Sequence, residues 1–223
     1  MTDTRQRLIA ATIATLRDKG MAGTSARVIA AAAGANQALV FYHFGTVDEL
    51  IDVACREGTA ERVAAYRDQF ADVRSLRELL AVGRRINDVE REAGNVAVLA
   101  QVLAGGQQHP GLAAAARHAL DLWITEIETA LARLLRSSPL GDVVDVPGLA
   151  RGIAASFVGI ELYDGVDPAG AERALSALET LGVLVEVVDD LGPVARRALR
   201  ARLRKTGQQP DSRQKARHAG GAT

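Results

Sequence analysis

The sequence has few of the residues on which disulfide-linked, zinc-binding or membrane-spanning proteins depend. Its single cysteine, Cys55, excludes an internal disulfide and any zinc site built on cysteines. No apolar run reaches the roughly 18 residues that cross a bilayer. The stretch from Leu8 to Leu16 contains threonines and is followed by charges, which is typical of an amphipathic helix and not of a cleavable signal. We therefore expect a cytoplasmic protein with no membrane partner.

Aromatic residues and strand patterns are also scarce. Phe, Trp and Tyr make up 4% of the chain and hydrophobic residues as a whole 48%, so the core would consist mainly of Ala, Leu, Val and Ile. The one β-branched run, at 143–146, stands between Gly141 and Pro147 and is interpreted as a loop. Good helix formers dominate elsewhere, and glycines and prolines divide the chain into about nine or ten helical segments. The sequence thus predicts an all-α protein.

The chain has no net charge, but its positive and negative residues are segregated along the sequence. Lys and Arg number 27 and Asp and Glu also number 27. Residues 1–47 carry five cations and two anions, residues 48–195 carry 13 and 24, and residues 196–223 carry nine and one. Basic ends on an acidic body favour contact of the ends, and not of the body, with a polyanion.

The start of the chain has the pattern of two consecutive helices. Residues 4–19 place apolar side chains on one helical face, and Gly20 ends that helix. Thr24 or Ser25 can cap a second helix, because a hydroxyl oxygen accepts a hydrogen bond from an unpaired backbone N–H.

A sharp turn and a third, shorter helix follow. Gly34 can adopt the positive φ that a tight turn between helices requires. Asn36 can cap a helix that runs to about His43 and buries Val40 and Phe41. Two short helices joined by a turn that contains glycine form a helix-turn-helix.

These motifs resemble one known family. The sequence TSARVIA at 24–30, the pair Ala33-Gly34, the sequence VFYHFGT at 40–46 and Asp48-Glu49-Leu50 are similar to the TetR/AcrR family of bacterial transcriptional repressors. The resemblance covers about residues 4–55. It implies a helix-turn-helix DNA-binding domain at 1–47 and a helical ligand-binding and dimerisation domain at 48–205. A basic tail without large apolar residues, 206–223, is expected to be disordered.

The third helix is expected to enter the major groove of double-stranded DNA, where Gln37 suits a bidentate contact with adenine. Ala38 and Leu39 can offer apolar contact to a thymine methyl group, and Arg27 suits guanine or a phosphate. The resemblance implies phosphate contacts by Thr24, Ser25, Tyr42 and His43. The expected DNA-binding residues are Thr24, Ser25, Arg27, Asn36, Gln37, Ala38, Leu39, Tyr42 and His43.

Some of these assignments have alternatives. His43 could pack against its neighbours and bond a carbonyl group instead of a phosphate, and the helix-turn-helix could be purely structural. Arg5 and Arg7 are expected to precede the first helix, from where they could reach an adjacent phosphate or the minor groove. Many relatives have cations at the positions of Gln37 and Val47, so fewer phosphate contacts and a shallower salt dependence are expected here.

The resemblance also implies a small-molecule pocket among the middle helices. Polar or aromatic residues within apolar stretches are the candidates: Tyr66, Gln101, His118, Trp123 and Glu126. Trp123 also fits an apolar helical stripe and could belong to the core, and His118 could be solvated.

Two C-terminal helical segments, 147–165 and 168–190, are candidates for a homodimer interface. In the second segment, apolar residues recur at heptad spacing. The first segment has small residues that permit another helix to approach closely. The expected interface residues are Ile153, Phe157, Ile160, Leu178, Leu181, Val185 and Val188. The same residues could instead form intrachain core.

We therefore expect a dimeric transcriptional regulator that represses its target genes. It would bind a palindromic operator and be released from it by a small molecule. The alternative is a helical dimer that binds no DNA and sequesters a ligand or a protein. No enzyme activity, metal or cofactor is expected, because the four histidines are scattered and no catalytic or nucleotide-binding signature is present. The basic tail could add nonspecific DNA affinity or only solubility.

Overall fold

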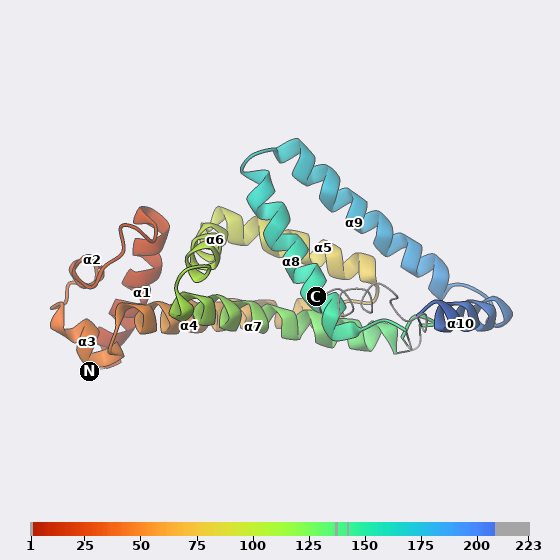
Figure 1. Cartoon of the computed structure of the whole chain (residues 1–223), viewed down its shortest axis with the longest axis horizontal. Helices are drawn as coiled ribbons and strands as arrows, with labels where there is room; N and C mark the ends of the chain where they lie inside the picture. The colour runs from red at the N-terminus through yellow and green to blue at the C-terminus, as the bar shows by residue number, and fades with distance from the viewer. Residues whose placement is uncertain (1, 137, 142, 208–223) are drawn as a thin grey trace, which may run out of the picture.

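The computed structural model describes residues 2–136, 138–141 and 143–207. Within these residues it contains ten α-helices and no strand, so the predicted all-α fold is confirmed (Figure 1). The helices are α1 (Thr2–Lys19), α2 (Ala26–Ala32), α3 (Ala38–Phe44), α4 (Val47–Asp72), α5 (Leu76–Glu92), α6 (Asn95–Gly106), α7 (Pro110–Leu135), α8 (Val146–Asp164), α9 (Pro168–Asp189) and α10 (Pro193–Gly207).

The first three helices and the start of the fourth form a small head around one apolar core. Leu8 of α1, Ile29 of α2, Val40 of α3 and Leu50 of α4 are each completely buried in a single cluster. Since each helix contributes one apolar face to this cluster, the head is held together by burial of aliphatic side chains.

The long helix α4 connects the head to the body. The backbone N–H of Glu49 donates to Oγ1 of Thr46 (3.1 Å) and the Thr46 hydroxyl donates back to the Glu49 carboxylate (3.1 Å), so Thr46 caps the start of α4. With 26 residues, α4 extends over about 39 Å and runs from the head along the body (Figure 1). The predicted domain boundary after residue 47 therefore falls at the first turn of a continuous helix.

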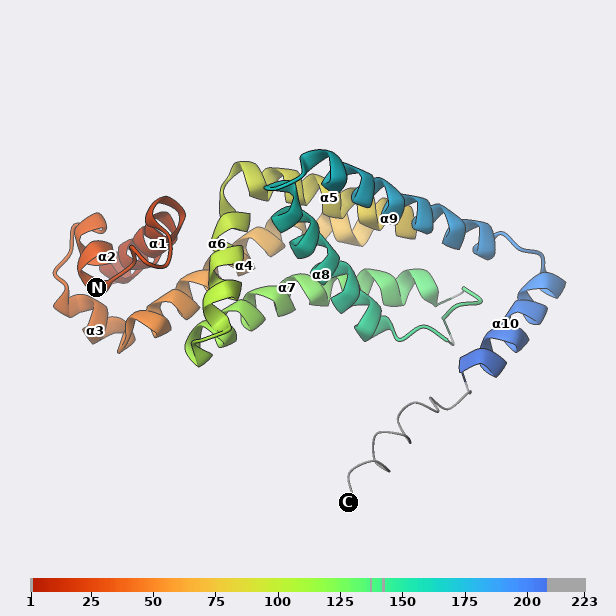
Figure 2. The ribbon, with the colours of Figure 1, turned by 45° about the horizontal axis from the view of Figure 1, so that its top comes forward.

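The body is a helical bundle built on α4 and α7. These two helices pack along one another, α5, α6 and α8 lie against them, and α9 packs on α5 and α8 (Figure 2). Its core cluster includes Phe70, Ile127 and Leu131, which are almost fully buried. At Gly182 of α9 an added Cβ would lie 3.1 Å from the Cα of Arg77, so glycine permits the close approach of α9 to α5.

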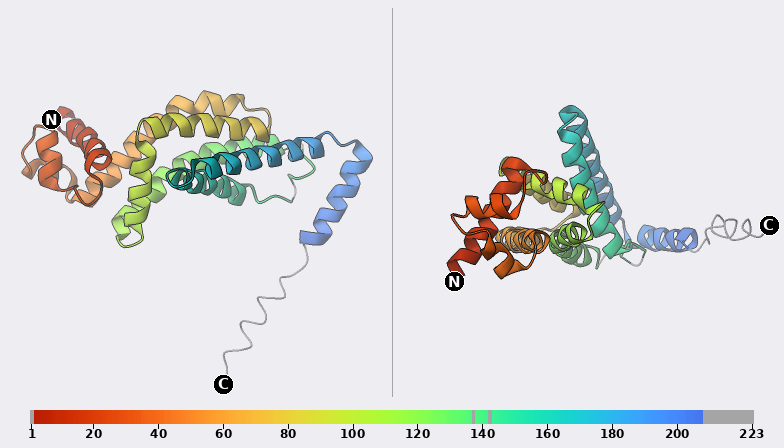
Figure 3. Two further views of the ribbon diagram at one scale, coloured as in Figure 1. Left: turned by 90° about the horizontal axis from the view of Figure 1, so that it is seen from above. Right: turned by 60° about the vertical axis from the view of Figure 1, so that its left-hand side comes forward.

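The last helix, α10, leaves the bundle at the end of the molecule opposite to α3 (Figures 1 and 3). It continues to Gly207, two residues into the predicted tail, and residues 208–223 lie outside the described part of the chain. Within one chain, this basic helix is therefore remote from the helix-turn-helix surface. Among the described residues, no helix combines the length and the apolar character needed to span a lipid bilayer.

Candidate nucleic-acid interface and ligand cavity

The turn between α2 and α3 has the geometry that its sequence predicts. Gly34 has φ +60°, and the backbone N–H of Ala35 donates to the carbonyl of Ala30 (2.9 Å). The side-chain oxygen of Asn36 accepts from the backbone N–H of Ala38 (2.8 Å), which satisfies one of the unpaired donors at the start of α3. The third helix thus begins two residues later than predicted, while Asn36 still performs a capping role.

Hydroxyl groups fix the start of α2. Oγ of Ser25 accepts from the backbone N–H of Val28 (3.3 Å), so Ser25 is the N-cap. The hydroxyl of Thr24 donates to the carbonyl of Gly20 (2.7 Å), which ties the end of α1 to the start of α2. Both predicted residues therefore lie together at the amino end of α2.

One side of α3 faces away from the protein. Gln37, Ala38 and Tyr42 are exposed, Tyr42 at 69%, and Leu39 is half-buried. Arg27 on α2 is exposed as well and has no hydrogen-bond or ion-pair partner among the described residues. The ring of His43 is half-buried, with its centroid 5.0 Å from that of Tyr42 and 6.1 Å from that of Phe44. The predicted reading residues thus share one solvent-facing surface.

Two sequence-based expectations for this region are wrong. Phe41 is 48% exposed, because Val40 and Phe44, four residues apart, occupy the inward face of α3 and Phe41 falls on another side. Helix α1 begins at Thr2, so Arg5 and Arg7 lie within it and not before it.

Both of these arginines are engaged by the protein. Arg5 forms an ion pair with Glu57 of α4 (2.8 Å) and lies 5.5 Å from the centre of the Phe44 ring. Arg7 donates to the carbonyl of Ala33 (3.2 Å) at the end of α2. The two arginines hold the head together, instead of standing free for DNA as expected.

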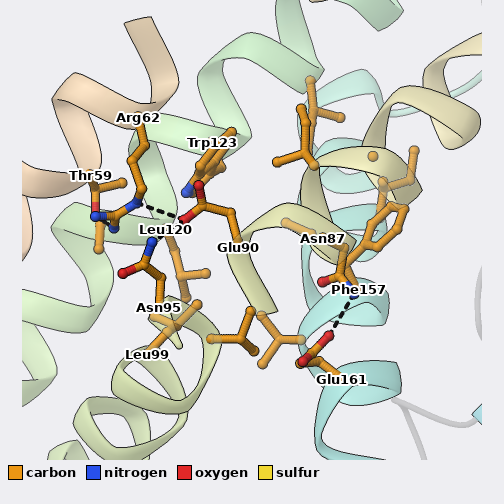
Figure 4. Close-up of a pocket in the computed structure, with 18 of the residues that line it drawn as sticks. Thr59, Arg62, Asn87, Glu90, Asn95, Leu99, Leu120, Trp123, Phe157 and Glu161 are labelled. Carbon is orange, nitrogen blue, oxygen red and sulfur yellow. Dashed lines mark hydrogen bonds and ion pairs between the residues drawn. The ribbon is translucent and has the colours of Figure 1, made fainter. Parts of the chain in front are cut away.

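The body contains a largely apolar cavity of about 140 Å³, lined by residues of α4, α5, α6, α7 and α8. The rings of Phe70, Trp123 and Phe157 form part of its wall, together with aliphatic side chains. Its polar lining residues are Thr59, Arg62, Asn87, Glu90, Asn95 and Glu161. These six residues gather at two separate ends of the cavity (Figure 4).

At one end, Arg62 and Glu90 form an ion pair of 2.8 Å between Nε and Oε2. Arg62 also donates to the hydroxyl of Thr59 (2.9 Å), and the amide of Asn95 donates to the Glu90 carboxylate (2.9 Å). At the other end, Asn87 donates to the carboxylate of Glu161 (2.5 Å). Burial raises the pKa of Glu161, and the Asn87 hydrogen bond and the charge of Arg91 only partly oppose that rise.

Polar contacts connect the head to the cavity wall. Arg17 of α1 donates to the side-chain oxygen of Asn95 (3.1 Å), the residue that also bonds Glu90. A separate contact joins the backbone N–H of Met21 to the side-chain oxygen of Gln101 on α6 (3.0 Å). The cavity wall and the helix-turn-helix head are therefore joined directly through α6.

Comparison with known proteins identifies the architecture. Residues 8–54 match the sequence profile of the bacterial regulatory proteins, tetR family. The multidrug binding protein EbrR, crystallised with imidazole, is 30% identical over 79% of this chain and 93% of EbrR, with a TM-score of 0.56. The chain belongs to the TetR family.

Two structures of lower sequence identity show the same fold over most of the chain. A Rhodococcus sp. protein assigned to the TetR-family transcriptional regulators is 20% identical over 85% of this chain and 100% of its own, with a TM-score of 0.68. Salmonella enterica GusR is 20% identical over 84% and 96%, with a TM-score of 0.62. No curated protein sequence matches the chain significantly.

Of the five ligand candidates that the TetR resemblance suggested, only Trp123 lines the cavity. Tyr66 does not line the cavity, but the centroid of its ring lies 6.0 Å from that of the Trp123 ring. Gln101 bonds the head, His118 pairs with Asp52 (2.9 Å) and Glu126 pairs with Arg67 (3.1 Å).

Sequence reasoning missed the charged residues of this TetR cavity. Glu90 and Glu161 each follow a lining apolar residue, Ile86 and Phe157, by four positions, so a carboxylate on an apolar helical face was the available signal. Among the described residues, no group of three or more histidine, cysteine or acidic side chains is placed to hold a metal ion.

The predicted dimer residues are divided between different surfaces of this TetR body. Ile153 and Phe157 line the cavity. Leu181 is exposed, whereas Ile160, Leu178, Val185 and Val188 are half-buried. The more exposed apolar residues on the outer sides of α8 and α9 are Leu162, Tyr163, Leu181, Leu184 and Val187.

Proposed function

We propose that this TetR-family chain is a transcriptional repressor that binds a palindromic operator as a homodimer and is released by a small molecule. The observation that carries the proposal is the uncovered surface of α2 and α3, where Gln37, Tyr42 and the unpaired Arg27 stand together. An α-helix fits the major groove, and residues at its amino end reach the base edges.

Each side chain of this surface suits one kind of contact. The amide of Gln37 matches the donor and acceptor of adenine, and Ala38 and Leu39 match a thymine methyl group. The guanidinium of Arg27 matches guanine or a phosphate. Thr24, Ser25, Asn36, Tyr42 and His43 would contact phosphates and so fix the register of the helix without reading sequence.

A homodimer is supported by the outer faces of α8 and α9. A Cβ added at Gly152 or Gly159 would meet nothing within 4 Å, and Leu181 and Leu184 of α9 are more than half exposed. Exposed small residues on α8 and exposed leucines on α9 allow two helical pairs to approach closely and bury apolar area. We propose that the interface is formed by the exposed residues of α8 and α9, with Ile160, Leu178, Val185 and Val188 at its edge. Ile153 and Phe157 line the cavity and are not included in the interface.

Release is supported by the position of the cavity. A ligand that fills the cavity would displace the part of its wall that Glu90 and Asn95 form, and so alter the hydrogen bond of Arg17 to Asn95 that holds the head against α6. It lowers DNA affinity only if it prefers the arrangement that does not bind DNA. EbrR, named as a multidrug binding protein, supports a small-molecule occupant for this cavity.

Selection from a pool of random DNA duplexes tests the proposal. We expect enrichment of a palindrome whose half-site centres are spaced by about one helical turn, 34–36 Å, or a multiple of it. Footprinting on the selected sequence should then show two protected half-sites. An intact dimer that enriches no sequence would contradict the proposal and favour the alternative of a helical dimer that sequesters a ligand or a protein.

A further inference from the structure

The charges of the cavity are not balanced. Arg62 is compensated by Glu90 at 2.8 Å and further engaged by Thr59. At the opposite end, Glu161 is only 9% exposed, and its only hydrogen-bond partner among the described residues is the neutral amide of Asn87. The cavity therefore holds one carboxylate beyond what its own cation compensates.

Arg91, the cation outside the cavity whose charge acts on Glu161, is already engaged. Arg91 donates to Asp164 (2.7 Å) and lies 3.5 Å from Asp88, so two carboxylates share its charge. A buried carboxylate without a full counter-ion is costly, and a cation brought by a ligand removes that cost.

The apolar and aromatic residues that line the cavity indicate the uncharged part of the ligand. Phe157 precedes Glu161 by one helical turn, so its ring and the carboxylate face the same side of α8 (Figure 4). Trp123 and Phe70 also line the cavity and add aromatic surface. An apolar aromatic group beside a positive nitrogen would satisfy both features.

We propose that the cavity binds small hydrophobic ammonium ions, with the positive nitrogen at Glu161 and the apolar group between Trp123 and Phe157. This inference rests on the proposed function and names its ligand class. A volume of about 140 Å³ is enough for one aromatic ring, since an engineered cavity of about 150 Å³ holds benzene. Carboxylate ligands are disfavoured because Glu161 repels them and Arg62 is already paired.

Three probes of similar shape test this assignment: 2-phenylethylammonium, its neutral counterpart 2-phenylethanol, and the anion phenylacetate. Trp123 is the only tryptophan of the chain, so its fluorescence reports binding in this cavity, and calorimetry gives the affinities. We expect the ammonium ion to bind at least about 10-fold more tightly than the alcohol, as one charge-assisted contact would give. Phenylacetate should bind most weakly.

Glu161→Gln should lower the affinity of the ammonium ion to that of the alcohol and leave the alcohol unchanged. Glu61→Gln is the matched control, because Glu61 is exposed on α4 and outside the cavity, and all three affinities should stay the same. Equal affinity of ammonium and alcohol for the unmodified protein, or tightest binding of phenylacetate, would overturn the proposal. So would an unchanged ammonium affinity in a folded Glu161→Gln protein.

Adding each probe to the complex with selected DNA separates this proposal from the previous one. If the ammonium ion binds as expected but the DNA complex persists, the ligand class stands and ligand-controlled release fails. If the alcohol or the acid dissociates the complex and the ammonium ion does not, release stands and the ligand class is wrong.

Discussion

Arg17 and Asn95 form a direct polar link between the helix-turn-helix head and the wall of the cavity. Nη2 of Arg17 lies 3.1 Å from Oδ1 of Asn95, and the amide nitrogen of Asn95 donates to Glu90 (2.9 Å). Gly94 makes this route possible, since its φ is +74° and a Cβ there would lie 2.9 Å from the Arg17 side chain. One amide thus connects α1 to the buried ion pair of α4 and α5.

Asn95→Ala should therefore weaken the coupling between ligand and DNA. We expect the change in DNA affinity caused by saturating 2-phenylethylammonium to shrink by about 2- to 30-fold, the range that corresponds to 0.5–2 kcal/mol of coupling. Fluorescence anisotropy of labelled operator DNA, with and without the probe, measures it.

Gln101→Ala is the matched control for that experiment. It removes the contact of α6 with Met21 but no bond to the ion pair, because Gln101 lies outside the cavity wall. Each variant should lose about 1 kcal/mol of stability, while only Asn95→Ala changes the coupling. Equal coupling in both variants would rule out the Arg17–Asn95–Glu90 route.

Arg27 and Gln37 should differ in what they contribute to DNA recognition. Gln37→Ala should cost about 5- to 150-fold in affinity for the selected operator, the equivalent of 1–3 kcal/mol, and relax the preference at one base pair. If Arg27 contacts guanine, Arg27→Ala should have the same effect at another base pair. If Arg27 contacts a phosphate, Arg27→Ala should weaken binding to DNA of every sequence and lower the slope of the salt dependence by about one.

Arg85→Ala controls for the loss of a positive charge. Arg85 is exposed on α5 in the body and has no ion-pair partner among the described residues. Its removal should leave affinity and salt dependence unchanged. Operator binding by Arg27→Ala and Gln37→Ala that matches the Arg85→Ala control would disprove the assigned role of this surface.

Local signals in the sequence were sufficient to predict the head. The cap by Ser25, the turn at Gly34 and the burial of Val40 each depend on residues within a few positions of one another. Arg5 was misjudged because its partner Glu57 lies 52 residues away and becomes a neighbour only when α1 packs on α4. Phe41 was misjudged because an aromatic residue alone does not reveal which side of a short helix it occupies.

The cavity could not be predicted to the same extent, because five helices contribute to it. Polar residues in apolar segments were the right kind of signal, yet Gln101 and His118 point to the partners Met21 and Asp52 instead. Which polar residue faces the cavity depends on how each helix is rotated in the bundle, and helical periodicity does not fix that rotation.

Leu184→Asp should break the proposed dimer. Leu184 is 56% exposed on the outer side of α9, and a two-fold interface contains it twice, so each copy would bury an unpaired carboxylate. We expect dissociation to become easier by about 100-fold or more, on the order of the 3–5 kcal/mol that an uncompensated buried charge costs. Analytical ultracentrifugation measures it.

Val89→Asp is the control for that variant. Val89 is similarly exposed but lies on α5, outside the assigned interface, so its replacement should leave the dimer intact. A dimer that survives Leu184→Asp, or that dissociates equally with Val89→Asp, would place the interface elsewhere.

Cys55 should react slowly with thiol reagents in the folded protein. Burial raises its pKa from 9.0 to about 11, with a smaller opposing effect of Arg62 and a reinforcing one of Asp52. At pH 8 the thiolate fraction is then about 100-fold lower than in the unfolded chain. The rate of modification should fall at least in that proportion, and adding denaturant should restore it. Equal rates in the folded and denatured protein would contradict the buried position.

The buried carboxyl of Glu161 should make stability depend on pH. Below the ordinary glutamate pKa of about 4.3 the group is neutral in the folded and the unfolded chain and costs nothing. As pH rises above that value, the unfolded chain releases the proton more readily, because burial raises the pKa in the folded state. The group therefore lowers stability progressively through this window, until the folded protein also ionises. Asn87 and Arg91 limit the loss, while Asp164 and Asp88 increase it.

Glu161→Gln removes this titration while its side-chain oxygen can still accept the hydrogen bond from Asn87. The thermal midpoints of the variant and the unmodified protein should be similar near pH 4, and the variant should become the more stable one as pH rises to 8. The exposed Glu61→Gln should show no such divergence. A constant difference across this range, or a variant that is less stable at pH 8, would mean that the Glu161 carboxylate is compensated within the protein, and the cavity would then have no reason to favour a cation.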